Sequence, residues 1–145
     1  MQAAPVHHQN ALRRGDVLEV TIEKLVLGGL GLAKHGELRV FVERALPGQV
    51  VKVMVTQKKP QYVMAEVKEI LKESPMAIKP KCPYFATSKM INEQKASCGG
   101  CLWQNLTYEE QLKTKETQVK ETLQRIGRIA DIQVKPILAS PEPFY

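Results

Sequence analysis

Apolar and polar residues alternate along the first half of the chain, which is typical of strands with one buried face. In the first such run the residues expected to be buried are Leu18, Val20 and Ile22. Further apolar runs follow at roughly ten-residue spacing, at 38–42, 49–57 and 62–71. Glycines within 28–36 and the Pro47-Gly48 pair indicate bends and turns between them. We therefore expect a mainly β fold, a small five-stranded antiparallel OB-like barrel over residues 15–71.

The chain is basic. Its 145 residues carry a formal net charge of +6 at pH 7, with an isoelectric point near 9.3, and the excess is shared by both halves of the chain. Such a charge favours attraction to a polyanion such as nucleic acid. Seven basic residues of the predicted barrel are candidates for phosphate contacts: Lys24, Lys34, Arg39, Arg44, Lys52, Lys58 and Lys59.

Aromatic residues are scarce in the predicted barrel, which contains only Phe41 and Tyr62. Barrels that bind single-stranded nucleic acid usually combine a basic groove with aromatic stacking. Phe41 lies between Val40 and Val42 in an apolar run, so we interpret it as a core residue. Contacts with the phosphate backbone are therefore expected to outweigh base stacking.

Residues 72–106 show neither a strand nor a helix period, and prolines interrupt their first part. We expect an irregular loop here. It contains all three cysteines, Cys82, Cys98 and Cys101, the last two in a Cys-Gly-Gly-Cys turn. A sulfur-only set suits an iron–sulfur cluster or zinc, while three unrelated reduced thiols are the simpler alternative. No fourth ligand is evident, because all three histidines lie in or before the barrel.

An amphipathic helix is predicted over residues 107–128. Thr107 and Glu110 have the spacing of a capping box, and Gly127 supplies the C-terminal stop. The apolar residues at helical spacing are Leu112, Val119, Leu123 and Ile126. Outside the helix, residues 1–14 are expected to be flexible, and 129–145 contain one strand-like run around 132–138.

The sequence contains no recognisable active site. It has no nucleophile–base pair and no phosphate-cradling or dinucleotide-binding loop. It also has no signal peptide and no apolar window long enough to span a membrane. We therefore expect a cytoplasmic protein, where thiols stay reduced and clustered cysteines indicate a metal or redox site.

Several segments in order resemble the N-terminal part of the RNA (uracil-5-)-methyltransferases. They are "GDVLEVTIEKLVLGGLGLAKHGELRVFVERALPGQVVKVMV", "ESPMAIKPKCPYF", "CGGCLWQNLTYEEQLKTKETQV" and "SPEPFY". The resemblance implies a TRAM domain over 15–71, an iron–sulfur loop over 72–106 and, from 129 onward, the connection to a methyltransferase domain that this chain lacks. It thus identifies the chain as a fragment of such an enzyme.

The resemblance also implies ligands and partners. In the family, loop cysteines hold a [4Fe-4S] cluster, and the matching residues are Cys82, Cys98 and Cys101. S-adenosylmethionine would bind only the absent domain, which carries the catalytic residues, so no catalytic or donor-binding residue is expected here. The expected partner is RNA, either 23S rRNA or tRNA, with no DNA and no membrane partner.

Two departures from the family pattern stand out. The gap between Cys82 and Cys98 is longer than usual, and the fourth cluster ligand would lie beyond Tyr145. Two other functions therefore stay open. One is a standalone RNA-binding module with a structural metal site, and the other is a redox or metal sensor that uses Cys98 and Cys101.

Overall fold

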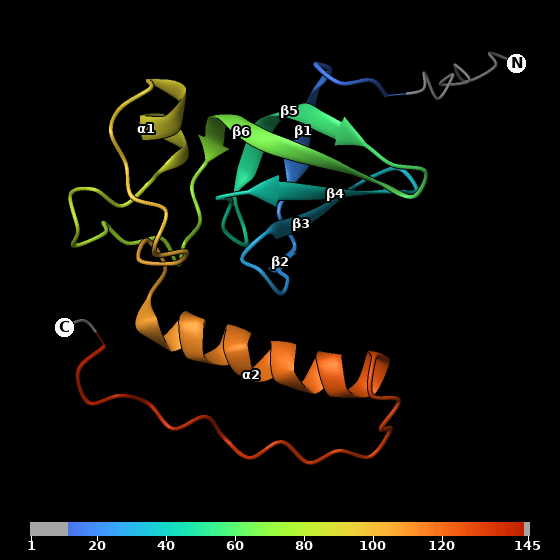
Figure 1. The fold of residues 1–145 in the computed structure, drawn as a ribbon, viewed down its shortest axis with the longest axis vertical. Helices are drawn as coiled ribbons and strands as arrows, with labels where there is room; N and C mark the ends of the chain where they lie inside the picture. The colour runs from blue at the N-terminus through green and yellow to red at the C-terminus, as the bar shows by residue number, and fades with distance from the viewer. Residues whose placement is uncertain (1–11, 144–145) are drawn as a thin grey trace, which may run out of the picture.

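The computed structural model describes residues 12–143, so most of the segment 1–14, which we expected to be flexible, lies outside the described residues. The fold is mainly β, as predicted (Figure 1). Over the described residues the elements are β1 (Val17–Thr21), β2 (Lys24–Leu25), β3 (Gly31–His35), β4 (Leu38–Glu43), β5 (Val50–Lys58), β6 (Tyr62–Lys72), α1 (Ser88–Asn92) and α2 (Tyr108–Arg125).

The strands form one sheet in the order β1-β5-β6-β4-β3-β2. Neighbouring strands are antiparallel except β4 and β6, which are parallel, with Arg39 opposite Tyr62 and Phe41 opposite Met64. Residues 44–49 carry the chain away from β4 to the side of β1, so that β5 pairs with β1 and β6 returns beside β4 in the same direction. The sheet is therefore mixed and has six strands where we expected five, and the fully antiparallel arrangement that we expected is wrong at this pair.

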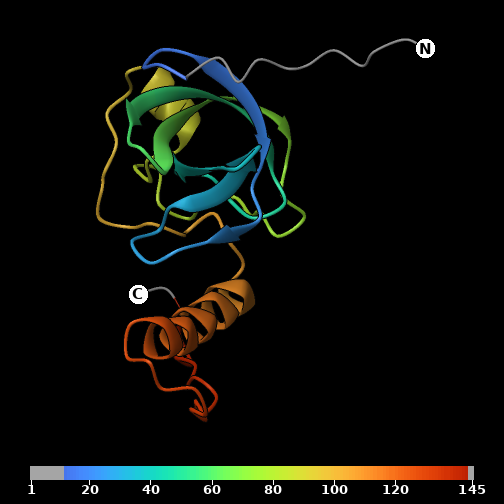
Figure 2. The same ribbon diagram turned by 90° about the vertical axis from the view of Figure 1, so that its right-hand side faces the viewer.

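The two ends of the sheet order, β1 and β2, are consecutive in the chain and are joined by Ile22 and Glu23. The Ile22 N–H donates to the Gln49 carbonyl at 2.9 Å, and the Glu23 N–H donates to the Leu32 carbonyl at 2.8 Å. This bent segment therefore passes from β5 to β3, and the sheet curls around one core (Figure 2). A Cβ on Gly31 would lie 2.9 Å from the Ile22 side chain, so the bend requires glycine at this position.

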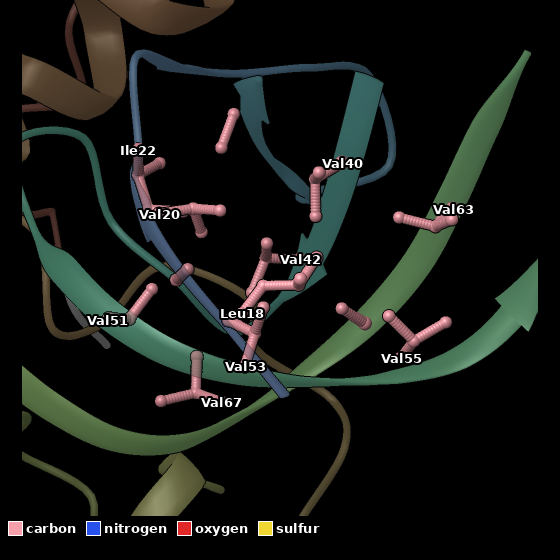
Figure 3. Packing of buried hydrophobic residues seen from close by; sticks show 13 residues of the cluster. Leu18, Val20, Ile22, Val40, Val42, Val51, Val53, Val55, Val63 and Val67 are labelled. Carbon is pink, nitrogen blue, oxygen red and sulfur yellow. The ribbon is translucent and has the colours of Figure 1, made fainter. Parts of the chain in front are cut away.

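The core lies inside the curl and consists mainly of valines (Figure 3). Leu18, Val20 and Ile22 are buried, as the alternation predicted. Val40 and Val42 of β4 are completely buried, as are residues of β5 and β6 on the same inner face, namely Val51, Val53, Val55, Val63 and Ala65. Burial of these side chains is the main favourable term in the stability of the barrel.

A second, smaller cluster joins the barrel to the loop that carries the cysteines. Leu25 and Leu46 of the barrel pack with Leu106, which is completely buried. Trp103 and Met76 pack against the same cluster. Because Leu106 follows the last cysteine closely, this contact fixes the end of the loop against the barrel.

Gln49 organises the turn in the segment "ALPGQ". Its side chain is buried, yet both ends have hydrogen-bond partners. The Leu46 N–H donates to Gln49 Oε1 at 2.7 Å, and Gln49 Nε2 donates to Glu73 Oε1 at 2.6 Å. The amide thereby ties the turn to the start of the cysteine loop, which gives this motif a structural role.

Helix α1 was not predicted, because its five residues are too short to show a period. Thr87 caps it, accepting a hydrogen bond from the Met90 N–H at 3.2 Å. Its last residue, Asn92, donates to the carbonyls of Val67 and Lys68 on β6. The region 72–106 is therefore irregular except for one short helix that is attached to the far end of β6.

Helix α2 forms where expected, but its termini differ in detail. Thr107 occupies the N-cap position without a side-chain capping bond, and its N–H donates to the Met76 carbonyl instead of to Glu110. The predicted capping box is therefore wrong. At the other end Arg128 adopts the left-handed conformation, with φ 54°, rather than Gly127. Glycine is still required there, because a Cβ would lie 2.6 Å from the Leu123 carbonyl oxygen.

The apolar stripe predicted for α2 is not buried against the barrel. Val119 and Ile126 are exposed, and Gln118 is the buried residue of the helix. Polar groups make the contacts instead: Lys24 Nζ lies 2.6 Å from Glu121 Oε1, and Gln118 Nε2 lies 3.5 Å from the Leu25 carbonyl. A cavity of about 300 Å³ remains between β2 and α2.

The segment after α2 runs back along the helix on the side away from the barrel (Figures 1 and 2). The Ile137 N–H donates to the Glu116 carboxylate at 3.2 Å, and the Ser140 N–H donates to the Tyr108 hydroxyl at 2.8 Å. The strand-like run predicted around 132–138 is not a strand in the structure.

Among residues 12–143, neither helix has the length and apolar character needed to cross a membrane.

Candidate nucleic-acid interface and cysteine loop

Four of the seven predicted basic residues gather at one end of the barrel. Lys34 of β3 is directly opposite Arg39 of β4, and Arg39 is directly opposite Tyr62, the first residue of β6. Lys58 and Lys59 enter the β5–β6 turn, where the Lys59 N–H donates to the Tyr62 carbonyl at 2.9 Å. All four side chains are exposed. We call this group, Lys34, Arg39, Lys58 and Lys59, the basic end.

Most of the basic end has no acidic partner. Within residues 12–143, Arg39, Lys58 and Lys59 form no salt bridge, and Lys34 lies 3.7 Å from Glu23 in an exposed pair. An exposed pair at that distance contributes little stability and breaks readily. The basic end can therefore neutralise an anion without first losing a strong internal contact.

The other three predicted residues are engaged elsewhere. Lys24 pairs with Glu121 of α2. Arg44 donates from Nη1 to the Ala86 carbonyl at 2.8 Å and so holds the cysteine loop. Lys52 lies 2.9 Å from Glu69, and that hydrogen bond is the main reason that the pKa of Lys52 is raised. These three side chains already have partners within the fold, and the structure does not bring them to the basic end.

The two aromatic residues of the barrel form a pair on its outer surface. Their ring centroids are 5.3 Å apart and the ring planes meet at 84°, an edge-to-face arrangement. Val40 and Val42 point into the core, so Phe41 between them points outward and is only half-buried. The interpretation of Phe41 as a core residue is therefore wrong.

The three cysteines lie in one loop region, connected by hydrogen bonds. Cys82 is half-buried, whereas Cys98 and Cys101 are exposed, and all three are free thiols. The Cys98 N–H donates to the Tyr84 carbonyl at 2.6 Å, which brings the Cys-Gly-Gly-Cys turn beside the segment that follows Cys82. The long stretch between Cys82 and Cys98 includes α1, and its two ends therefore lie close together.

Gln104 connects the first and last cysteines, and sequence reasoning missed it. Its Oε1 accepts a hydrogen bond from the Cys82 N–H at 3.1 Å, while its Nε2 donates to the Cys101 sulfur, also at 3.1 Å. The sequence held one indication of this contact, since Gln104 is only three residues after Cys101 in the segment "CGGCLWQ". Sulfur ligands commonly receive such hydrogen bonds from their surroundings.

The three cysteine sulfurs are the type of ligand that binds zinc or an iron–sulfur cluster. No three His, Cys, Asp or Glu side chains within residues 12–143 are grouped closely enough to hold a metal ion. Gly100 and Cys98 contact each other, with the Gly100 N–H 3.4 Å from the Cys98 sulfur. A metal site shared by the three cysteines therefore stays a prediction.

Comparison with known proteins identifies the domain and its relatives. Residues 11–68 match the TRAM domain family. An uncharacterized RNA methyltransferase of Halalkalibacterium halodurans is 36% identical over 143 residues, which cover 99% of this chain and 28% of that protein. Proteins of the same description from Nitratidesulfovibrio vulgaris and Bdellovibrio bacteriovorus are 39% and 38% identical over 88% of this chain, covering 25% and 30% of their lengths.

The chain thus spans between a quarter and three tenths of the length of these relatives. A solved structure of a conserved protein from Methanococcus maripaludis is 34% identical and covers 48% of this chain and 100% of its own, with a TM-score of 0.39. The resemblance stated from the sequence is confirmed for the TRAM domain and for the RNA methyltransferase relatives. Residues 11–68 are therefore a TRAM domain, and nearly the whole chain is similar to part of proteins described as uncharacterized RNA methyltransferases.

Proposed function

We propose that this chain is the RNA-binding portion of an S-adenosylmethionine-dependent enzyme that methylates C5 of uracil in 23S rRNA or tRNA. The TRAM domain and the names of the relatives support RNA as the partner. Methyl transfer itself would depend on residues outside 1–145. Within the chain, the observation that carries the proposal is the basic end, where three exposed cations have no salt bridge in the described residues.

The physical basis of binding would be neutralisation of phosphates. A Lys or Arg side chain that contacts a phosphate releases a condensed counterion, and this release favours binding. Lys58 and Lys59 can do so without losing an internal partner, whereas Lys52 would first have to leave Glu69. Lys58 and Lys59 are therefore expected to contribute more to RNA binding than Lys52, although all three carry the same charge.

The test compares two sets of charge-removing variants. The double variant Lys58→Ala/Lys59→Ala is expected to weaken binding of single-stranded RNA by about tenfold or more, and by similar factors for different sequences, because phosphate contacts carry no sequence information. The matched control Lys52→Ala removes an engaged charge and should change affinity by much less. Fluorescence anisotropy with labelled oligonucleotides at one fixed salt concentration measures both.

Equal losses from Lys52→Ala and from the double variant would show that net charge alone matters, and would contradict an interface at the basic end. A loss confined to one RNA sequence would indicate base readout in place of phosphate contacts. Circular dichroism of each variant checks that the fold is retained.

We propose further that Cys82, Cys98 and Cys101 are ligands of a [4Fe-4S] cluster, with a fourth ligand from outside these residues. Support comes from the sulfur-only donor set and from Gln104, which contacts both Cys82 and Cys101. Bound, such a cluster would supply a covalent crosslink between the two ends of the loop. Reduced thiols of this kind suit the cytoplasm, where we propose that the protein acts.

Two alternatives make different predictions about metal content. A standalone RNA-binding module with a structural site would bind zinc in place of iron and sulfide. A redox or metal sensor that uses Cys98 and Cys101 is favoured by the exposure of both thiols, and it would cycle between free and oxidised cysteines without a permanent metal. Measurement of bound metal separates the three.

A further inference from the structure

Three strands present a continuous outer surface beside the basic end. In one row across β3, β4 and β6, Leu32 lies opposite Phe41 and Phe41 lies opposite Met64, all half-buried. In the next row Lys34 lies opposite Arg39, and Arg39 lies opposite Tyr62. Residues two apart on a strand share a face, so the two rows are neighbours on the same outer surface. An apolar row with an aromatic centre thus borders a row of cations.

The geometry of the aromatic pair keeps the two faces of one ring clear of the other ring. When two rings meet edge to face, the ring that presents its edge keeps both of its own faces clear of its partner. Phe41 and Tyr62 meet in this way, at 84° between ring planes, and both are only half-buried. A planar nucleobase can stack on an exposed aromatic face whatever its identity, because every base has a π surface.

We propose that Phe41 and Tyr62 form a stacking platform for one or two unpaired RNA bases, whose phosphates are bound by Arg39 and Lys59. The proposal rests on the proposed RNA-binding function and deepens it. It changes the expected mode of binding, because the bases as well as the backbone contribute. The chemistry calls for single-stranded RNA, since bases in a duplex have no free face to offer.

Charge on the surface supports an anionic occupant at this end. Arg39 lies directly opposite Tyr62 in the register, and Lys59 is bonded to Tyr62 through the backbone, so cations flank the platform on two sides. The acidic residues of the same strands, Glu43 of β4 and Glu66 and Glu69 of β6, lie toward the other end, where Glu43 is opposite Glu66. A strand of RNA would therefore cross the platform near Arg39 and avoid the acidic end.

The neighbouring helices leave the platform accessible. Asn92 of α1 contacts β6 at Val67 and Lys68, on the side of Glu66 away from Tyr62. Helix α2 contacts the barrel through Lys24 and Leu25 of β2. Figure 1 shows the turn between β5 and β6 projecting away from both helices. In the described residues, the outer surface around Tyr62 therefore has no helix across it.

The test uses two oligouridines of equal length and charge, one of them with abasic sites at its central positions. The intact chain is expected to bind the complete oligonucleotide more tightly than the abasic one. Phe41→Leu and Tyr62→Leu should each lower affinity for the complete oligonucleotide by about 5- to 100-fold, with little change for the abasic one. The matched control Tyr108→Leu, in α2, should leave both affinities unchanged.

The outcomes separate this inference from the proposed function. Equal binding of both oligonucleotides, together with unchanged affinity in the Phe41 and Tyr62 variants, would overturn the platform and leave phosphate binding by the barrel intact. No binding of either oligonucleotide would overturn the RNA-binding function and the platform with it. Thermal unfolding of each variant shows whether the fold survives. If Phe41→Leu unfolds, Tyr62→Leu and the abasic comparison in the intact chain still decide the question.

Discussion

Replacing Leu106 with alanine is expected to destabilise the chain by about 2–5 kcal/mol, because a completely buried leucine leaves a cavity when it is truncated. Leu106 packs against Leu25 and Leu46 and so joins the cysteine loop to the barrel. For a chain of this size each kcal/mol lowers the melting temperature by about 2–4 °C. Thermal or urea unfolding measures the change.

The control is the same substitution at an exposed site. Leu138 is 94% exposed, and Leu138→Ala should change the free energy of unfolding by less than about 0.5 kcal/mol. Leu106→Ala should also increase the rate at which the half-buried Cys82 reacts with a thiol reagent below the melting temperature, because the nearby Gln104, which binds the Cys82 N–H, is no longer fixed. Equal stability of the two variants would contradict the role given to Leu106.

The second large effect concerns iron. Anaerobic reconstitution with iron and sulfide should give a chain that binds both and loses them on exposure to air, because three thiolates leave one iron of a cubane cluster open to other ligands. Cys98→Ser and Cys101→Ser should each retain only a small part of the bound iron. The neighbouring variant Ser97→Ala should bind as much as the unaltered chain. Iron and sulfide assays, with the absorption spectrum, measure the result.

Several results would count against the cluster. Stoichiometric zinc without sulfide would support the structural metal site instead. Bound iron that is the same in the cysteine variants and in the unaltered chain would show that the thiols are not the ligands. A cluster that is stable in air would mean that a fourth ligand lies within residues 1–145, contrary to the proposal.

Much of the barrel could be predicted because one physical rule governs each strand. Burial of one face and exposure of the other forces a period of two, and Leu18, Val20 and Ile22 follow it. The same rule places Phe41 on the outer face, since the valines on either side of it point inward. We expected Phe41 in the core because it is apolar, but in the structure its position in the alternation determines the direction of its side chain.

Other features depend on contacts that no local pattern records. The parallel pairing of β4 with β6 follows from the path of residues 44–49 across the barrel. Helix α2 was expected to bury Val119 and Ile126, yet Lys24 and Gln118 make its contacts with the barrel. A helical period shows which residues share a face, and whether a neighbour covers that face is decided by tertiary packing.

The candidate site could likewise be predicted only in part from the sequence. The sequence supplied all seven basic residues, but it could not separate those with partners from those without, because Lys24–Glu121, Arg44–Ala86 and Lys52–Glu69 join distant segments. The register of β4 and β6 placed Arg39 opposite Tyr62, and the β5–β6 turn placed Lys59 beside it. Gln104 was overlooked for a related reason, since its two hydrogen bonds have meaning only once Cys82 and Cys101 are known to lie near each other.

The most direct test of RNA binding at the basic end is the dependence of affinity on salt. Each phosphate neutralised on a single strand contributes about −0.7 to the slope of log affinity against log salt concentration. Two to four contacts, as the basic end allows, predict a slope between about −1.4 and −2.8 for the unaltered chain, and a smaller slope for Lys58→Ala/Lys59→Ala. Binding that is independent of salt, or a slope that the double variant leaves unchanged, would contradict the account.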